Sequence, residues 1–116
     1  MNYSNPLFLI SILDAVIFCT AGLLMLKFPP KKINSLYGYR TKNSMKSQES
    51  WDFAQKLSAL KMIKAGIIMF GFAIVGFLII ISNKLALAIG LGVLILLVIW
   101  LWVSTEKAIK NKFNNE

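Results

Sequence analysis

One apolar run of the chain reads LALAIGLGVLILLVIWLWV and extends from Leu85 to Val103. It contains no charged residue, and at 1.5 Å per residue it is long enough to cross a hydrocarbon layer about 30 Å thick. Two other runs have a similar length: LFLISILDAVIFCTAGLLMLKF, over Leu7–Phe28, and MIKAGIIMFGFAIVGFLIII, over about Met62–Ile81. Because backbone groups in lipid must bond within their own segment, all three runs are expected to be membrane-spanning helices.

The composition also favours a membrane protein. Of the 116 residues, 57% are hydrophobic and 16% are charged, and the mean hydropathy is +0.66. Soluble domains carry about 25% charged residues, so a soluble enzyme domain is disfavoured. We therefore expect a single all-α membrane domain over residues 1–116, with a basic cytoplasmic loop over about 29–61 between the first and second spans.

The first apolar run has a second interpretation, as a cleaved signal peptide. Residues 1–6 hold no Lys or Arg, and no small-residue cleavage site precedes a hydrophilic region. Cys19 follows Phe18, whereas a lipoprotein attachment site requires a small residue there. These observations favour a retained helix.

The positive charges predict the orientation of the spans. The net charge is +8, and 12 of the 13 Lys and Arg residues lie in or beside the loop or in the C-terminal tail. By the positive-inside rule, that side is cytoplasmic, and the N-terminus and the Ser82–Lys84 turn lie outside. Topology and attraction to lipid account for the basic residues more simply than nucleic-acid binding, so the bilayer is the expected partner.

Several kinds of chemistry have no candidate residues. The chain has no histidine and one cysteine, Cys19. It shows no nucleophile–base pair, no metal-ligand cluster and no glycine-rich phosphate loop. We therefore expect a protein that is not an enzyme and that uses neither a cofactor nor a metal.

The loop is expected to be ordered at its start and helical at its end. Pro29-Pro30 ends the first helix, and Gly38 suggests a backbone position with positive φ or close packing. Ser47 is a good N-cap for a following helix, with Glu49 in its first turn.

From Gln48 onward, apolar residues recur at spacings of three and four, at Phe53, Leu57 and Leu60. Two interpretations remain open for this amphipathic helix. In the first, the helix lies at the inner membrane surface and its lysines reach lipid phosphates. In the second, it is a solvated extension of the second span.

The loop also carries a recognisable set of residues. In order along the chain, its members are Asn34, Tyr37, Gly38, Tyr39, Arg40, Thr41, Ser44, Met45, Lys46, Glu49, Trp51, Phe53 and Ala54. This ordered set, placed between the first and second of three spans, resembles the signature of the SdpI family.

The resemblance implies a function in the bacterial cell membrane. Members of the family confer immunity: a producing bacterium protects itself from its own secreted toxin peptide, which attacks the membrane. The resemblance also implies a signalling receptor that holds a transcriptional repressor at the membrane when the toxin is present. The expected partners are therefore a toxin peptide and a cytoplasmic repressor.

Two interpretations of the motif remain open. Arg40 is the only arginine, and its planar fork can bind a phosphate or carboxylate at two points. Glu49 and Asp52 are candidate partners within the chain, and lipid headgroups or a partner protein are candidates outside it. Alternatively, the motif residues only lock the loop against the helices.

Asp14 is the other unusual residue, because it lies roughly 10 Å into the first span at 1.5 Å per residue. A carboxylate there is costly and usually faces the bundle interior or a wet cavity. It is expected to be protonated, or hydrogen-bonded by Ser11 or a backbone group. The competing functional interpretation is a small proton- or cation-coupled transporter that uses Asp14.

Small residues on the second and third spans mark surfaces where helices can approach closely. They serve packing within one chain and assembly of a homo-oligomer equally well. They are Gly66, Ala73 and Gly76 in the second span, and the pairs Ala86/Gly90 and Ala88/Gly92 in the third.

Overall fold

The computed structural model describes residues 4–113 and contains three helices, with no strand among those residues. They are α1 (Pro6–Lys27), α2 (Gln48–Leu78) and α3 (Asn83–Phe113). All three are long and apolar enough to cross a membrane. The predicted all-α membrane fold with three spans is therefore confirmed, and the chain is a multi-pass membrane protein.

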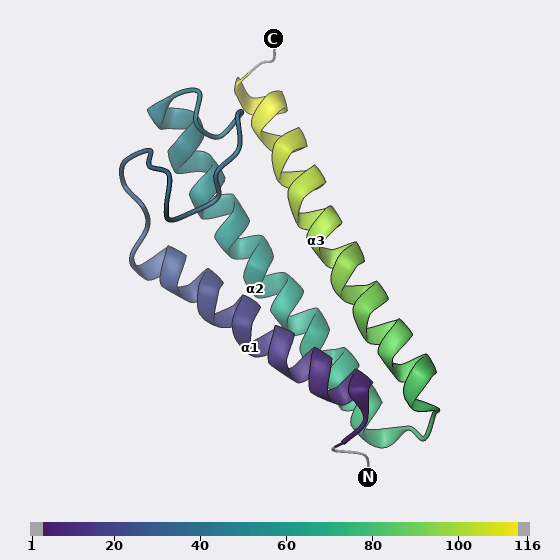
Figure 1. Cartoon of the computed structure of the whole chain (residues 1–116). Coiled ribbons are helices and arrows are strands. Elements are labelled where there is room, and N and C mark those ends of the chain that lie inside the picture. Colours follow the sequence, from purple (N-terminus) through teal and green to yellow (C-terminus); the bar gives the residue numbers. More distant parts are fainter. Residues whose placement is uncertain (1–3, 114–116) are drawn as a thin grey trace.

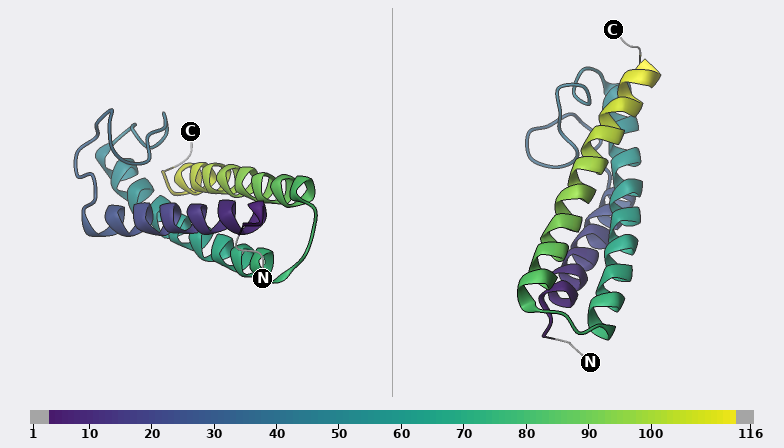
Figure 2. Two further views of the ribbon diagram at one scale, coloured as in Figure 1. Left: turned by 60° about the horizontal axis from the view of Figure 1, so that its bottom comes forward. Right: turned by 90° about the vertical axis from the view of Figure 1, so that its right-hand side faces the viewer.

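The helices run alternately up and down, so that each end of the bundle has a distinct character (Figure 1). The start of α1 and the short connection between α2 and α3 lie at one end. The connection between α1 and α2, residues 28–47, lies at the other end beside the last turns of α3, in every view (Figure 2). We call residues 28–47 the motif loop. The basic residues of the loop and of the end of α3 therefore gather at one end of the bundle.

The two helix ends that border the motif loop lie where the sequence predicted them. The α1 helix ends at Lys27, just before Pro29-Pro30, and Ser47 caps α2 by accepting a hydrogen bond from the backbone N–H of Ser50 at 3.1 Å. Glu49 lies in the first turn of α2, where a negative charge favours the helix dipole. These caps fix both ends of the motif loop.

The α1 and α2 helices pack closely because glycines remove the side chains between them. A Cβ atom on Gly22 would lie 2.7 Å from the carbonyl oxygen of Ala59 on α2, and one on Gly76 would lie 2.7 Å from the backbone nitrogen of Phe8 on α1. A Cβ atom on Gly66 would contact the Sγ atom and the backbone of Cys19. The predicted packing role of the small residues in the second span is confirmed, since Ala73 is also buried.

Replacing Gly76 with alanine is expected to destabilise the pair of helices by about 1–3 kcal/mol, the usual cost of overpacking, because the opposing atom is rigid backbone. The matched control is Gly71→Ala on the same helix, where an added Cβ meets nothing within 4 Å. That control is expected to be neutral or stabilising, since alanine favours a helix over glycine. Thermal unfolding in detergent measures both, and equal melting temperatures would contradict the packing argument.

The α3 helix is less embedded than the other two, with only a few of its residues buried. Ala86 and Gly90 are buried, and the space above Gly90 is occupied by Ile10 of α1 at 3.4 Å. Gly92 faces open space. Of the two small-residue pairs in the third span, the fold therefore uses Ala86/Gly90 within the chain.

The helices extend beyond the predicted spans. The amphipathic stretch and the second span form one continuous helix, α2, which ends at Leu78 rather than Ile81. The predicted third span, Leu85–Val103, continues as helix to Phe113. At 1.5 Å per residue, α2 and α3 are each about 46 Å long, against about 33 Å for α1. The two longer helices therefore project past the end of α1, and the motif loop packs against the projecting parts.

The buried face at the start of α2 differs from the apolar stripe expected from the sequence. Leu60, one member of that stripe, is 47% exposed, whereas Trp51 and Gln55 on roughly the opposite face are at most 2% exposed. The physical reason is that the motif loop covers this face, and its backbone polar groups require hydrogen-bonding partners there.

Candidate functional site

The first turn of the motif loop is organised by Asn34. Its Oδ1 atom accepts hydrogen bonds from the backbone N–H groups of Leu36 and Tyr37 at 2.9 and 2.8 Å, and its Nδ2 donates to the carbonyl of Lys32 at 2.8 Å. This is the arrangement by which asparagine builds a turn. The hydroxyl of Tyr37 then donates to the carbonyl of Phe28 at 2.8 Å, which joins the turn to the end of α1.

Gly38 brings the loop backbone onto α2. Its φ is +109°, and an added Cβ would lie 2.6 Å from the Oε1 atom of Gln55 and 2.7 Å from Pro30 Cγ. The predicted positive φ and the predicted close packing are both confirmed. Only glycine meets both conditions without strain.

Gln55 on α2 holds the next residue of the loop by both of its amide atoms. Its Oε1 accepts from the backbone N–H of Tyr39 at 2.6 Å, and its Nε2 donates to the carbonyl of Tyr39 at 2.8 Å. The side chain is 2% exposed. Gln55 thus bonds the Tyr39 backbone as a neighbouring strand would, and it is a site residue that the sequence analysis did not identify.

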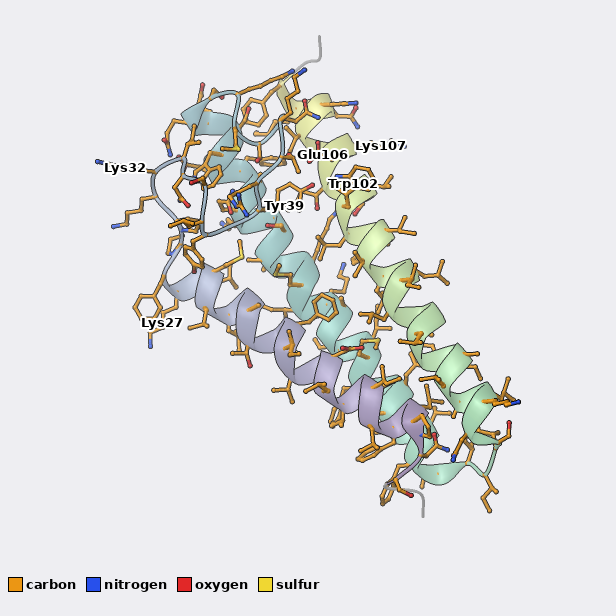
Figure 3. The ribbon with its side chains drawn as sticks, viewed as in Figure 1. Lys27, Lys32, Tyr39, Trp102, Glu106 and Lys107 are labelled. Atoms are coloured by element: carbon orange, nitrogen blue, oxygen red, sulfur yellow. The ribbon has the colours of Figure 1, made fainter. Side chains whose placement is uncertain are left out.

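Glu106 on α3 is the second residue that the sequence analysis missed, and three loop side chains donate to its carboxylate. The hydroxyls of Tyr39 and Thr41 donate to Oε2 at 2.5 and 2.7 Å, and Nδ2 of Asn43 donates to Oε1 at 2.7 Å. Figure 3 shows Tyr39, from the loop, directed toward Glu106 on the facing helix. We call Tyr39, Thr41, Asn43 and Glu106 the Glu106 cluster.

The hydrogen bonds of this cluster change the acidity of its members. Burial alone raises the pKa of Glu106, but the three hydrogen bonds and the nearby charge of Lys110 outweigh it, so its pKa lies below the ordinary value. Burial, followed by the hydrogen bond to Glu106 and the charge of Glu106, raises the pKa of Tyr39 despite an opposing hydrogen bond with Thr41. The cluster therefore holds an ionised carboxylate against a neutral phenol.

Ser44 closes the turn that presents Thr41 to the cluster. It is fully buried, its Oγ accepts from the backbone N–H of Thr41 at 2.8 Å, and its backbone N–H donates to Oγ1 of Thr41 at 3.1 Å. Its hydroxyl lies 3.1 Å from the carbonyls of Tyr39 and Thr41 as a donor. Ser44 thus supports the cluster through its hydrogen bonds to Tyr39 and Thr41.

Trp51 fixes the other side of the motif loop. It is fully buried, and its Nε1 donates to the carbonyl of Pro30 at 2.5 Å. Ala54, one turn further along α2, is also fully buried. Phe53 points elsewhere and packs its ring edge-on against Phe113 at 5.6 Å between centroids. The structure therefore brings most of the motif together and places Phe53 at its margin.

Arg40 lies outside this network. It is exposed, and within residues 4–113 neither of its two expected partners bonds it. Asp52 instead accepts a hydrogen bond from Gln48 Nε2 at 2.8 Å. Lipid headgroups or a partner protein therefore remain the candidate partners of Arg40.

Lys61 on α2 contacts α3. Its Nζ donates to Oγ of Ser104 on α3 at 2.5 Å and lies 5.5 Å from the ring centroid of Trp100. This contact joins α2 to α3 near the Glu106 cluster.

Asp14 and Ser11 lie in α1, apart from the motif loop. Ser11 is fully buried, and its Oγ and the Oδ2 of Asp14 have no hydrogen-bond partner in the described part of the chain. Ser11 therefore does not bond Asp14, contrary to one of the expectations above. Among residues 4–113, no group of three or more His, Cys, Asp or Glu side chains is arranged to hold a metal ion.

Comparison with known proteins gives the same assignment as the motif. A 51-residue segment, 44% of the chain, is 51% identical to the uncharacterized protein YfhL of Bacillus subtilis (strain 168), and it covers 46% of that relative. No solved structure matches the chain. The model of the SdpI/YfhL protein family matches residues 31–104, which include most of the motif loop, all of α2 and the apolar part of α3. The chain belongs to the SdpI/YfhL protein family.

Proposed function

We propose that the protein is a membrane immunity protein, which gives resistance to a secreted, membrane-active toxin peptide by binding rather than by catalysis. Membership of the family carries this proposal, because the family resemblance implies that function. The hydrogen bonds that hold the motif loop to all three helices add support. Following the positive-inside rule, we infer that the motif loop and the C-terminal end of α3 face the cytoplasm and that the N-terminus lies outside.

The two ends of the helix bundle differ in character, which suggests that toxin recognition and repressor binding would take place at opposite ends. The apolar faces of the helices and the outer end of the bundle are the surfaces that a membrane-active peptide meets first. The motif loop presents Arg40, Lys42 and Lys46 as exposed positive charges at the opposite end. A repressor held at the membrane would contact this basic surface through acidic groups.

Expression in a toxin-sensitive bacterium tests the proposal. The wild-type protein is expected to raise the toxin concentration needed to stop growth, whereas a variant with Gln55 changed to alanine, which releases the Tyr39 backbone, is expected to lose protection at an equal membrane level. Ser35→Ala, an exposed change in the same loop, is the matched control. No protection by the wild type against any candidate toxin peptide would count against immunity.

A second candidate function, proton- or cation-coupled transport, rests on the unpartnered Oδ2 atom of Asp14 in the same helix as the unpartnered hydroxyl of Ser11. A carboxylate with a buried, unpartnered oxygen is the kind of group that exchanges protons or cations in transporters. Asp14→Asn is expected to abolish substrate-coupled proton movement in vesicles if this function holds. Continued protection of cells from toxin by the same D14N protein would separate transport from immunity.

A further inference from the structure

A cleft of about 420 Å³ opens between the end of α1 and the first turns of α2. Its lining includes the apolar residues Met25, Leu26 and Pro30, which we call its wall, and the charged residues Lys31, Asp52 and Lys56, which we call its rim. We call this the interface cleft. It is separate from the Glu106 cluster, which lies on the α3 side of the motif loop.

The wall of the interface cleft is held by hydrogen bonds to the loop backbone. The carbonyl of Pro30 accepts from the buried indole of Trp51 at 2.5 Å, and the carbonyl of Lys31 accepts from Gln48 Nε2 at 2.6 Å. The same Gln48 nitrogen donates to Oδ1 of Asp52 at 2.8 Å. The loop backbone that lines the cleft is therefore fixed, and Gln48 positions the carboxylate of Asp52.

The cleft lies where α1 leaves its apolar segment. Met25 and Leu26 belong to the last turn of α1, which ends at Lys27, and the 60% exposed ring of Phe28 follows. In a membrane protein, such a change from apolar to basic residues marks the boundary between hydrocarbon and headgroups. A molecule that fills the cleft therefore meets both apolar and charged side chains.

The rim charges indicate which headgroup fits. Lys31 and Lys56 offer two ammonium groups to a phosphate, and such charge-assisted hydrogen bonds are the strong ones. Asp52, one helical turn before Lys56, would repel a second negative group and accept a hydrogen bond from an ammonium group. We propose that the interface cleft binds a phospholipid with a primary ammonium group beside its phosphate. The phosphate lies at Lys31 and Lys56, the ammonium at Asp52, and an acyl chain along Leu26. This inference does not rest on the proposed immunity function.

Native mass spectrometry tests the proposal with the intact protein released from micelles that contain equal amounts of phosphatidylethanolamine, phosphatidylcholine and phosphatidylglycerol with identical acyl chains. We expect the ethanolamine lipid to be retained in preference to the other two. The choline headgroup lacks N–H donors, and the glycerol headgroup lacks a positive charge. The double variant K31Q/K56Q is expected to lower that retention about tenfold, the usual effect of losing charged hydrogen bonds.

Two further variants assign the roles of the rim residues. Asp52→Asn is expected to lower retention of phosphatidylethanolamine to the level of phosphatidylcholine and to leave phosphatidylcholine unchanged. Lys32→Gln is the matched control: it removes the same charge from the neighbouring residue, whose side chain points away from the bundle (Figure 3), and it is expected to change nothing.

Three outcomes would overturn the proposal. Equal retention of the three lipids by the wild type would show that the cleft does not select a headgroup. Preferential retention of phosphatidylglycerol would show a purely anionic site in which Asp52 has no role. A loss from Lys32→Gln as large as that from K31Q/K56Q would show that binding follows general surface charge rather than the cleft. Circular dichroism confirms that each variant remains helical.

Discussion

Alanine at position 38 is expected to detach the motif loop from α2. Gly38 has a φ of +109°, and forcing a side chain into that conformation costs about 1–3 kcal/mol. The added Cβ would also lie 2.6 Å from Gln55 Oε1, the atom that accepts from the Tyr39 backbone. Strain and displacement of Gln55 act on the same residue pair, so the loop is expected to lose both of its bonds to Gln55.

Limited trypsin digestion of the protein in detergent measures this release, because Arg40 and Lys42 lie within the same turn. A loss of about 1.4 kcal/mol in docking free energy corresponds to about tenfold faster cleavage when cleavage follows the opened population. Gly38→Asn tolerates positive φ but keeps the steric conflict, so it is expected to fall between wild type and Gly38→Ala. Cleavage of Gly38→Ala at the wild-type rate would contradict the role assigned to this glycine.

The second large effect is expected from Glu106→Gln, which keeps the shape of the side chain and removes its charge. The three donors of the Glu106 cluster would then face an amide with only one accepting oxygen. Hydrogen bonds to charged groups contribute about 1.5–3 kcal/mol each, so the loop is expected to separate from α3 while α1 and α2 stay packed. The pKa of Tyr39 is expected to fall toward its ordinary value, since its bond to a carboxylate and the negative charge are both lost.

Absorbance of tyrosinate during an alkaline titration reports this change in the pKa of Tyr39. Glu49→Gln is the matched control, because it removes the same charge from an exposed position in the first turn of α2. An unchanged tyrosine titration in Glu106→Gln would contradict the proposed coupling between the loop and α3.

The lowered pKa of Glu106 and the raised pKa of Tyr39 predict how docking of the motif loop depends on pH. The pKa of Glu106 is lower in the docked state than its ordinary value of 4.5, so its contribution is complete above that pH and is lost as the pH falls through the lowered pKa. The pKa of Tyr39 is raised above its ordinary value of 10.0, so docking weakens as the pH rises past that value. Hydrogen–deuterium exchange at the Tyr39 amide, corrected for the intrinsic pH dependence of exchange, is a suitable readout. Protection that stays constant across both ends of the pH range would contradict this prediction.

Much of the fold can be predicted from hydrophobicity alone, because each span must satisfy its backbone within itself. The apolar runs predicted three helices, and Pro29-Pro30 and Ser47 predicted the ends of the loop. The continuation of α3 to Phe113 was not predicted, since residues beyond Val103 are no longer apolar and resemble a tail. That continuation is what places Glu106 opposite the loop.

Only those site residues that act within a short stretch of chain were predicted from the sequence. Asn34, Gly38 and Ser44 act locally, through turns within a few residues, and such turns have recognisable sequence patterns. Gln55 and Glu106 act across 16 and 67 residues of the chain, respectively, and long-range pairs leave no periodic pattern. One sequence feature could have identified Glu106: it is one of only five acidic residues, and it lies just past the apolar segment of α3, at the same end of the bundle as the loop.

The motif loop bonds all three helices found in residues 4–113. Tyr37 bonds the end of α1, Gln55 on α2 bonds the Tyr39 backbone, and Tyr39 reaches Glu106 on α3. The loop residues that make these bonds, Tyr37 and Tyr39, are only two residues apart along the chain. A change in the spacing of the three helices must therefore change the length of at least one of these hydrogen bonds. A tilt of α3 away from α1 and α2 would therefore lengthen the hydrogen bond between the hydroxyl of Tyr39 and the carboxylate of Glu106.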